Sequence, residues 1–329
     1  MSIQVPSVLS QQYPMMSVEQ RIQASLHTTL NYLNNCTITQ LLKKYGNCYL
    51  FGGCIRSKIR GENPNDIDIL VITNNNAIDL GDVKRDLVIA GQDVIGVYQT
   101  LDYDGIKFDK EIGVVKLSCI DDFTDYRTND FTDYDIIFAP TLDSIHIDFD
   151  VNSLAIELGS SCNRVLLLGD HVNDQPSSNA NATNASIAAI YELILNKQFN
   201  VMQPMAIMTN QMYVRTCSCL LKRFGKLFVN CWKLQPTPNN LAVSLFILCT
   251  QRPNYSAVVD RENGAMAVAH LIMFVKIHGT FTQVKVLIDT LENSTYYKRV
   301  IERGTRSFRL RQYNENGSEL CQRLLRMFK

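Results

Sequence analysis

The chain has 329 residues, of which 46% are hydrophobic and 19% are charged, and its 32 lysines and arginines balance 32 aspartates and glutamates. This length is enough for a large core and about two domains. The start of the chain lacks a basic and apolar leader, and no apolar run reaches about 18 residues, so we expect neither a secretory signal nor a membrane-spanning helix.

The ten cysteines are scattered, mostly within apolar runs, and none belongs to a CxxC pair. We therefore expect free thiols in a reducing, cytoplasmic compartment rather than disulfides or a zinc site. Charge is uneven along the chain, because acidic residues dominate residues 60–150 and basic residues dominate residues 298–329. The asymmetry fits a metal site followed by a polyanion-binding tail, or two solvated faces.

Helices are predicted for residues 1–46. The capping box SVEQ at Ser17–Gln20 precedes a helical repeat of apolar residues. These apolar residues are Ile22, Leu26, Leu30 and Leu33. A second short helix is predicted for Thr37–Tyr45, where Gly46 ends it.

Mixed α/β structure is predicted for residues 47–174. NCYLFGG predicts a buried strand that ends at a glycine pair, CIRSKIR a short helix closed by Gly61, and DIDILVIT a strand from Asp66 to Thr73. EIGVVKLSCI and YDIIFA predict two more strands, whereas DFDVNSLAIEL, from Asp148, predicts a helix.

The low-complexity stretch QPSSNANATNAS, residues 175–186, predicts a linker. Long segments with helical apolar periodicity follow, so residues 187–329 are expected to form an all-α domain with a basic tail. The expected fold is therefore an α/β head, with helices around a mixed β-sheet, followed by an all-α C-terminal region.

Asp66 and Asp68 raise a chemical question, because both lie on a strand that is otherwise apolar. Residues i and i+2 of a strand share a face, so the two carboxylates repel each other about 6–7 Å apart. A divalent cation between them relieves this repulsion, and oxygen ligands suit Mg²⁺. An exposed edge strand with two solvated aspartates is the alternative.

The glycine pair Gly52–Gly53 lies about 13 residues upstream of Asp66, between a predicted strand and a predicted short helix. Backbone N–H groups at such a turn can face an anion, and Arg56 lies within reach of the same anion. Together with Asp66 and Asp68, this turn predicts a nucleoside triphosphate that bridges a phosphate-binding loop and a metal-binding strand. A glycine pair alone is usually a tight turn.

The stretch GGCIRSKIRGENPNDID resembles the head motif G-G-x-V-R-D-x-L-L-G-x-x-P-x-D-x-D of the tRNA nucleotidyltransferase and bacterial poly(A) polymerase family, within the DNA polymerase beta-like superfamily. The matching residues are Gly52, Gly53, Arg56, Gly61, Pro64, Asp66 and Asp68. Ser57 replaces the family's aspartate, and Arg60 replaces an apolar residue. The resemblance implies a nucleotidyltransferase head at residues 47–174 and a helical nucleotide- and RNA-binding domain at residues 187–329.

A second segment, Thr141–Glu157, resembles the family's R-R-D-F-T-x-N-A-L-A motif, which implies that Asp148 and Asn152 lie near the incoming ribose and base. The two arginines of that motif are His146 and Ile147 here. The candidates to replace their grip on the triphosphate are Arg56, Lys58, Arg127 and Arg164.

The resemblance also implies a third metal-binding carboxylate, on the strand just before this segment. Asp135 is the natural match, and Asp133, on the same face, is the alternative. The family's E-D-x-x-R element, which selects the base, has no match, because Asn210 and Gln211 stand where the acids are expected.

The basic tail suggests the acceptor. It interleaves tyrosines and a phenylalanine with basic residues, and aromatic rings stack on bases while arginines pair with phosphates. The predicted RNA-binding residues are Arg303, Arg306, Arg309 and Arg311. A basic amphipathic helix that packs on the body of the protein is the alternative.

The resemblance therefore implies a template-independent RNA nucleotidyltransferase that adds nucleotides, with AMP from ATP favoured, to an RNA 3′ end. Asp66, Asp68 and Asp135 would hold two Mg²⁺ ions, or Mn²⁺, while Gly52, Gly53 and Arg56 would bind the phosphates. Two alternatives remain open: transfer to a small molecule or to a protein hydroxyl, and a non-catalytic RNA-binding subunit.

Overall fold

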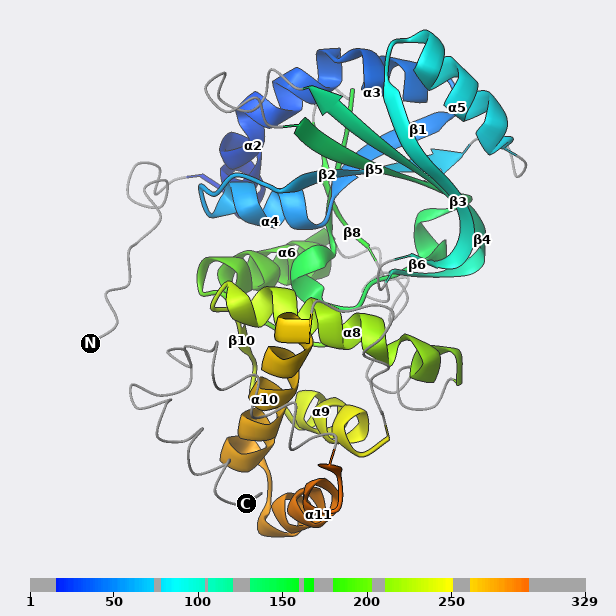
Figure 1. Ribbon diagram of the computed structural model, residues 1–329. Helices are drawn as coiled ribbons and strands as arrows, with labels where there is room; N and C mark the ends of the chain where they lie inside the picture. The colour runs from blue at the N-terminus through cyan, green and yellow to red at the C-terminus, as the bar shows by residue number, and fades with distance from the viewer. Residues whose placement is uncertain are drawn as a thin grey trace. The chain divides into compact units, whose positions relative to one another are not determined.

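The computed structural model describes residues 16–73, 78–103, 106–120, 131–159, 163–168, 180–202, 211–250 and 261–295. The chain divides into two compact units, which we call unit 1 (Met1–Asn196) and unit 2 (Lys197–Lys329). Unit 1 is α/β and the described part of unit 2 is predominantly helical (Figure 1). The predicted fold class, a mixed α/β head followed by a helical region, is confirmed.

Two helices open unit 1. In α2 (Val18–Asn35) the predicted capping box is present, because Gln20 N–H donates to Ser17 Oγ at 3.2 Å and Ser17 N–H donates to Gln20 Oε1 at 2.8 Å. Its predicted apolar face is buried. Helix α3 (Thr37–Leu42) ends three residues before the predicted Tyr45, since the N–H groups of Lys44 and Tyr45 close tighter turns onto Leu41 and Leu42.

The described strands of unit 1 form an eight-stranded mixed sheet with the order β3-β4-β5-β2-β1-β7-β8, in which β6 pairs with β4. The elements of its first half are β1 (Gly46–Phe51), α4 (Gly53–Ile59), β2 (Asp66–Thr73), α5 (Leu80–Ile89), β3 (Asp93–Tyr103), β4 (Ile106–Ile120) and β5 (Phe131–Ala139). Strand β1 is antiparallel to both of its neighbours, β2 and β7, whereas β2 and β5 are parallel. The end of β1 therefore meets the starts of β2 and β5 at one edge of the sheet.

The predicted helix from Asp148 is wrong. The remaining elements of the sheet region are η1 (Leu142–Ser144), β6 (Ile145–His146), η2 (Asp150–Asn152), β7 (Leu154–Glu157) and β8 (Val165–Leu167). Strand β7 lies between β1 and β8, and Leu154, Ala155 and Ile156 are all buried. A strand buried on both faces has a continuous apolar run, which periodicity alone does not distinguish from a helix.

Helix α6 (Ala180–Leu195) closes unit 1. It contains residues 180–186 of the predicted linker, so that prediction is wrong for these residues, while residues 175–179 lie outside the described part. Alanines favour a helix here, and the helix is held in place by the buried side chains of Ile187, Ile190, Tyr191 and Ile194. The domain limits predicted from the sequence otherwise stay a prediction.

Unit 2 packs its helices around aromatic side chains. Its described elements are β9 (Gln198–Phe199), α8 (Gln211–Val229), β10 (Lys233–Leu234), α9 (Pro238–Thr250), α10 (Arg261–His278) and α11 (Phe281–Glu292). The ring of Phe228 stacks on Phe224 and on the fully buried His270, whose ring centroid is 4.1 Å away. No described helix has both the length and the apolar character needed to cross a bilayer.

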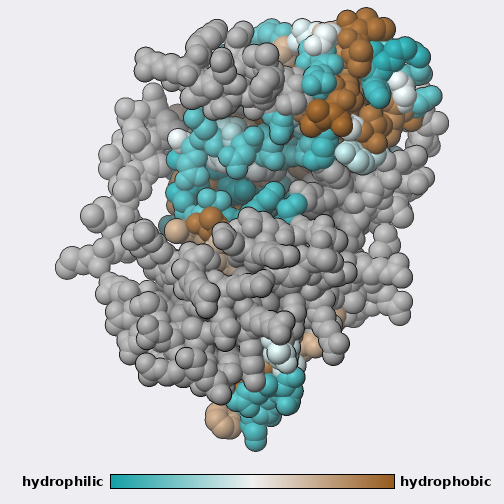
Figure 2. Space-filling view, viewed as in Figure 1, coloured by the Kyte–Doolittle hydropathy of each residue, from teal (hydrophilic) through white to brown (hydrophobic). Residues whose placement is uncertain are grey.

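The surface of unit 1 carries an apolar patch at the outermost strand of the sheet, β3. Val88 and Ile89 of α5 and Ile95 and Tyr98 of β3 are each at least half exposed. Figure 2 shows hydrophobic residues grouped at the upper right, where α5 lies in Figure 1. Strand β4 separates β3 from β5, so this patch is not part of the site described next.

Candidate active site

Three aspartates converge at the edge of the sheet where β1 ends. The parallel pairing of β2 and β5 sets Asp66 opposite Asp133 and Asp68 opposite Asp135. One carboxylate oxygen from each of Asp66, Asp68 and Asp135 lies within 4.8 Å of the other two, and we call these residues the acid trio. The structure thus brings together the three acids proposed from the sequence as metal ligands.

The chemistry of the acid trio fits a hard divalent cation. Asp66 and Asp68 are partly exposed, and Asp135 retains only 9% exposure. Three carboxylates this close repel one another, and a cation between them removes that cost. An oxygen-only donor set with room for water is the kind that Mg²⁺ prefers, because Mg²⁺ keeps part of its hydration shell. The acid trio could therefore hold a metal ion.

Asp133, the alternative third acid, lies elsewhere. It faces Asp66 in the parallel register but is exposed, and within the described ranges the metal-compatible group contains Asp135 instead. Asp135 is one pleat further along β5, opposite Asp68. The geometry therefore favours Asp135 over Asp133 as the third ligand.

The glycine turn, Gly52–Gly53, lies directly against the acid trio. Gly52 precedes α4 with φ 70° and ψ −134°, a conformation that glycine adopts readily and other residues rarely. A Cβ on Gly52 would lie 3.1 Å from Asp68 Oδ2, and one on Gly53 would lie 4.0 Å from the same oxygen. The β1–β2 register explains this approach, because Phe51 pairs with Asp68.

The residues predicted to bind the nucleotide form a second cluster beside the turn. Arg56 Nη1 donates a hydrogen bond to Asn152 Oδ1, and Asn152 Nδ2 donates to Asp148 Oδ1 at 3.4 Å. The N–H of Phe149 also donates to Asp148 Oδ1, at 2.8 Å. Hydrogen bonds thus connect the first sequence motif to the second, although the binding roles of these residues stay predictions.

Lys116 is a member of the site that the sequence did not reveal. It faces Asp135 across the antiparallel β4–β5 pair, and its Nζ lies 3.2 Å from both Oδ1 and Oδ2 of that carboxylate. The only signal in the sequence is a single lysine within the apolar run EIGVVKLSCI. Its partner depends on the register between β4 and β5, which that signal does not contain.

Ile147, which stands where the resembled motif has its second arginine, faces the protein interior. Ile147 is 3% exposed and packs in a core cluster with Tyr49, Phe51 and Val114. An arginine there would place a charge in the core. Among the four candidates to replace the arginine grip, Arg56 lies at the glycine turn, whereas Lys58 donates to Asn63 Oδ1 at 3.4 Å.

The other two candidates lie away from the turn or outside the described residues. Arg164 is exposed, and its carbonyl accepts from Glu157 N–H at the far end of β7. Arg127 lies outside the described residues, and so do the predicted RNA-binding residues Arg303, Arg306, Arg309 and Arg311.

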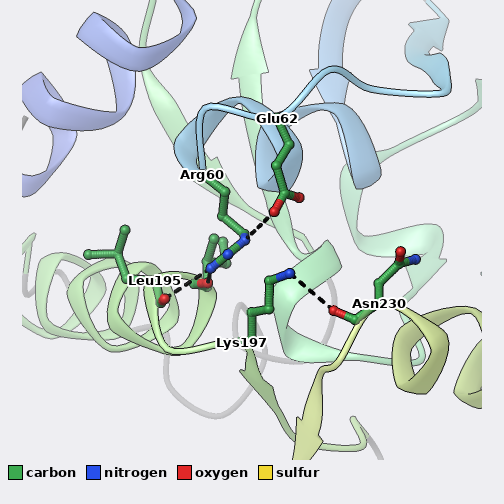
Figure 3. A network of polar contacts seen from close by, with 6 residues as sticks. Arg60, Glu62, Leu195, Lys197 and Asn230 are labelled. Atoms are coloured by element: carbon green, nitrogen blue, oxygen red, sulfur yellow. Dashed lines mark hydrogen bonds and ion pairs between the residues drawn. The ribbon is translucent and has the colours of Figure 1, made fainter. Parts of the chain in front are cut away.

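Arg60, which replaces an apolar residue of the family motif, fixes the end of α4. Its Nη1 donates to the carbonyl oxygens of Ile194 and Leu195 at 3.2 and 3.0 Å, and its Nε donates to Glu62 Oε1 at 3.0 Å (Figure 3). These contacts satisfy two of the last carbonyls of α6, which have no partner within that helix. Arg60 therefore joins α6 to the helix that carries Gly53 and Arg56.

Comparison with known proteins finds only distant structural likeness. No family model matches the chain, and no curated protein matches it. An apo form of a tRNA-processing enzyme is 15% identical, with a TM-score of 0.38 over 89% of this chain and 61% of that one. Two structures of a CCA-adding enzyme give similar values. The apo form I is 14% identical, with a TM-score of 0.44 over 94% of this chain and 68% of the other.

The complex of a CCA-adding enzyme with CTP is 13% identical, with a TM-score of 0.42 over 95% of this chain and 66% of the other. This chain therefore spans about 61% of the length of the tRNA-processing enzyme. Likeness at this level assigns neither a family nor an activity to the chain.

Proposed function

We propose that this protein is a template-independent RNA nucleotidyltransferase. The observation that carries the proposal is the meeting of the acid trio with the glycine turn at one edge of the sheet. Nucleotidyl transfer needs carboxylates that hold divalent cations next to a surface that accepts phosphates. Here the two features lie so close that a Cβ added to Gly52 would be 3.1 Å from Asp68 Oδ2.

The reaction would join an acceptor oxygen to the α-phosphorus of a nucleoside triphosphate and release pyrophosphate. Asp66, Asp68 and Asp135 would hold Mg²⁺ or Mn²⁺, and a pair of such ions supplies charge neutralisation at the α-phosphate and a lowered pKa for the attacking hydroxyl. Arg56 and the backbone of the glycine turn would bind the departing phosphates.

The second cluster would hold the nucleoside. Asp148 is 7% exposed and accepts from the Asn152 amide, which in turn accepts from Arg56. This arrangement can orient Arg56 toward the phosphates while Asp148 and Asn152 lie near the ribose and base, as the resemblance implies. We propose an RNA 3′ end as the acceptor and ATP as the favoured nucleotide, with the basic tail as the binding surface for RNA.

The experiment incubates the protein with a labelled oligoribonucleotide, each nucleoside triphosphate in turn, and Mg²⁺ or Mn²⁺. A ladder of extended products supports the proposal, with the longest ladder expected for ATP. Label that appears only on protein or on a small molecule supports transfer to another hydroxyl. RNA binding without transfer supports a non-catalytic subunit.

Asp66→Ala tests the site. It should lower extension by roughly 10³-fold or more, because it removes a ligand of the ions that stabilise the transition state, while RNA affinity stays nearly unchanged. Asp82→Ala is the matched control, since Asp82 pairs with Arg85 on the exposed face of α5. Full extension by Asp66→Ala would show that the metal site is wrongly assigned.

A further inference from the structure

Lys116 occupies an unusual position for a metal site, because its ammonium group faces one of the three ligands. Both oxygens of Asp135 lie 3.2 Å from Lys116 Nζ. The Lys116 side chain is 33% exposed and that of Asp135 is 12% exposed, so water screens this pair less than it screens a pair on the surface. The contact is fixed by direct opposition across β4 and β5.

Lys116 changes the net formal charge of the acid trio. Three carboxylates carry three negative charges, and Lys116 cancels one of them. A divalent cation at the acid trio therefore meets an attractive field from the aspartates and a repulsive one from Lys116. Asp135 Oδ2 accepts a hydrogen bond from the ammonium group and Oδ1 forms an ion pair with it, so coordination of a metal ion by Asp135 competes with the existing contact.

We propose that Lys116 sets the metal affinity of the site and makes it depend on bound nucleotide; this inference rests on the proposed function. Without nucleotide, Lys116 neutralises Asp135 and keeps binding of divalent cations weak. The triphosphate of a bound nucleotide brings negative charge that offsets Lys116, so full occupancy of the acid trio is reached only when substrate is present. The lysine thereby suppresses metal binding by the nucleotide-free protein.

Electron paramagnetic resonance of Mn²⁺ measures the metal affinity of the site, and it needs no turnover. The titration uses the full chain, with and without an ATP analogue whose α–β bridge is a methylene group. For the wild type we expect weak Mn²⁺ binding alone, and tighter binding with the analogue.

Lys116→Met should tighten nucleotide-free binding by about tenfold or more, because a unit charge a few ångströms from the ion is removed in a poorly screened site. It should also reduce the gain from the analogue.

Three further variants make the result specific. Lys116→Gln, which keeps a donor for Asp135 without the charge, should tighten Mn²⁺ binding as Lys116→Met does, and it replaces Lys116→Met if that variant does not fold. Lys116→Arg keeps the charge and should bind as the wild type does. Lys44→Met removes a lysine that is 65% exposed and 3.7 Å from Asp86, and should leave affinity unchanged.

Unchanged affinity in Lys116→Met or Lys116→Gln, or a change no larger than that of Lys44→Met, overturns the inference. Failure of the metal site on which the proposed function rests gives a different result: Asp68→Asn would then bind Mn²⁺ as tightly as the wild type, because the acid trio would not be the metal site. Loss of transfer with metal binding intact would contradict the proposed function alone, and the RNA extension experiment detects it.

Discussion

Gly52 and Asp68 are so close that a single methyl group on the glycine would press on the carboxylate, at 3.1 Å from Oδ2. The backbone of Gly52 also has a positive φ of 70°. Two separate features therefore favour glycine at position 52: the short distance to Asp68 and the positive φ of the backbone.

Gly52→Ala should lower the free energy of unfolding by about 1–3 kcal/mol through backbone strain, and should also weaken Mn²⁺ binding by displacing Asp68. Gly61→Ala is the matched control, because Gly61 has φ 71° and nothing within 4 Å of an added Cβ. Urea unfolding of both variants should show comparable losses of stability, whereas only Gly52→Ala should lose metal affinity. Equal metal affinity in the two variants would mean that the glycine turn does not support the site.

The choice of the third acid is open to a direct test. If the proposed function is correct, Asp135→Asn should reduce nucleotide transfer by roughly 10³-fold, since it would weaken one proposed ligand of the catalytic ions, and Asp133→Asn should leave transfer within about twofold of wild type. Single-turnover transfer to labelled RNA measures both. The reverse pattern would assign the third position to Asp133.

The Arg60 contacts predict a structural rather than a catalytic effect. Arg60→Leu restores the apolar residue of the family motif but removes the donors to the Ile194 and Leu195 carbonyls. The free energy of unfolding should fall by about 1–3 kcal/mol, because two partly buried carbonyl acceptors lose their donor. Urea unfolding measures this, and Arg85→Leu, on the exposed face of α5, should cost far less. Equal losses would show that the cap on α6 contributes nothing.

His270 predicts a loss of stability in acid. Burial lowers the pKa of His270 well below 6.5, because the charged imidazolium would lose its water inside unit 2. Above about pH 6.5 the ring is neutral in both the folded and the unfolded chain. As the pH falls below that value, the unfolded chain takes up a proton that the folded chain excludes, so the free energy of unfolding decreases by up to about 1.4 kcal/mol per pH unit.

His270→Phe keeps a ring against Phe228 and should flatten this dependence. Urea unfolding at about pH 8, 6 and 5 compares the two proteins. A slope that is the same in His270→Phe and in the wild type would locate the acid sensitivity at other groups.

The sequence was most informative where local signals agree with the fold. Strand β2 has the predicted bounds, Asp66 to Thr73, because it combines β-branched residues with a turn on its N-terminal side. The capping box of α2 is equally local, since Ser17 and Gln20 satisfy each other. The convergence of Asp66 and Asp68 on a shared face follows from strand geometry alone.

The predictions failed where pairing over long distances decides the structure. Residues Leu154–Glu157 form a strand only because β1 and β8 are available on either side. The sequence does not show that Lys116 belongs to the site, because the β4–β5 register is what places it opposite Asp135. Likewise, the sequence shows only that Ile147 replaces an arginine of the resembled motif, whereas the structure shows that Ile147 is part of the hydrophobic core.

Asp66 and Asp135 meet only because β2 and β5, far apart along the chain, lie side by side. Closing so long a loop costs entropy, and parallel pairing between remote segments is slow to form. A partly synthesised chain thus lacks the complete acid trio, the proposed metal site, until β5 has emerged and docked. An ion that binds only the finished sheet would shift the folding equilibrium towards the folded state by mass action. Because Lys116, in our proposal, weakens metal binding without nucleotide, magnesium would favour the complete fold mainly when nucleotide is bound as well.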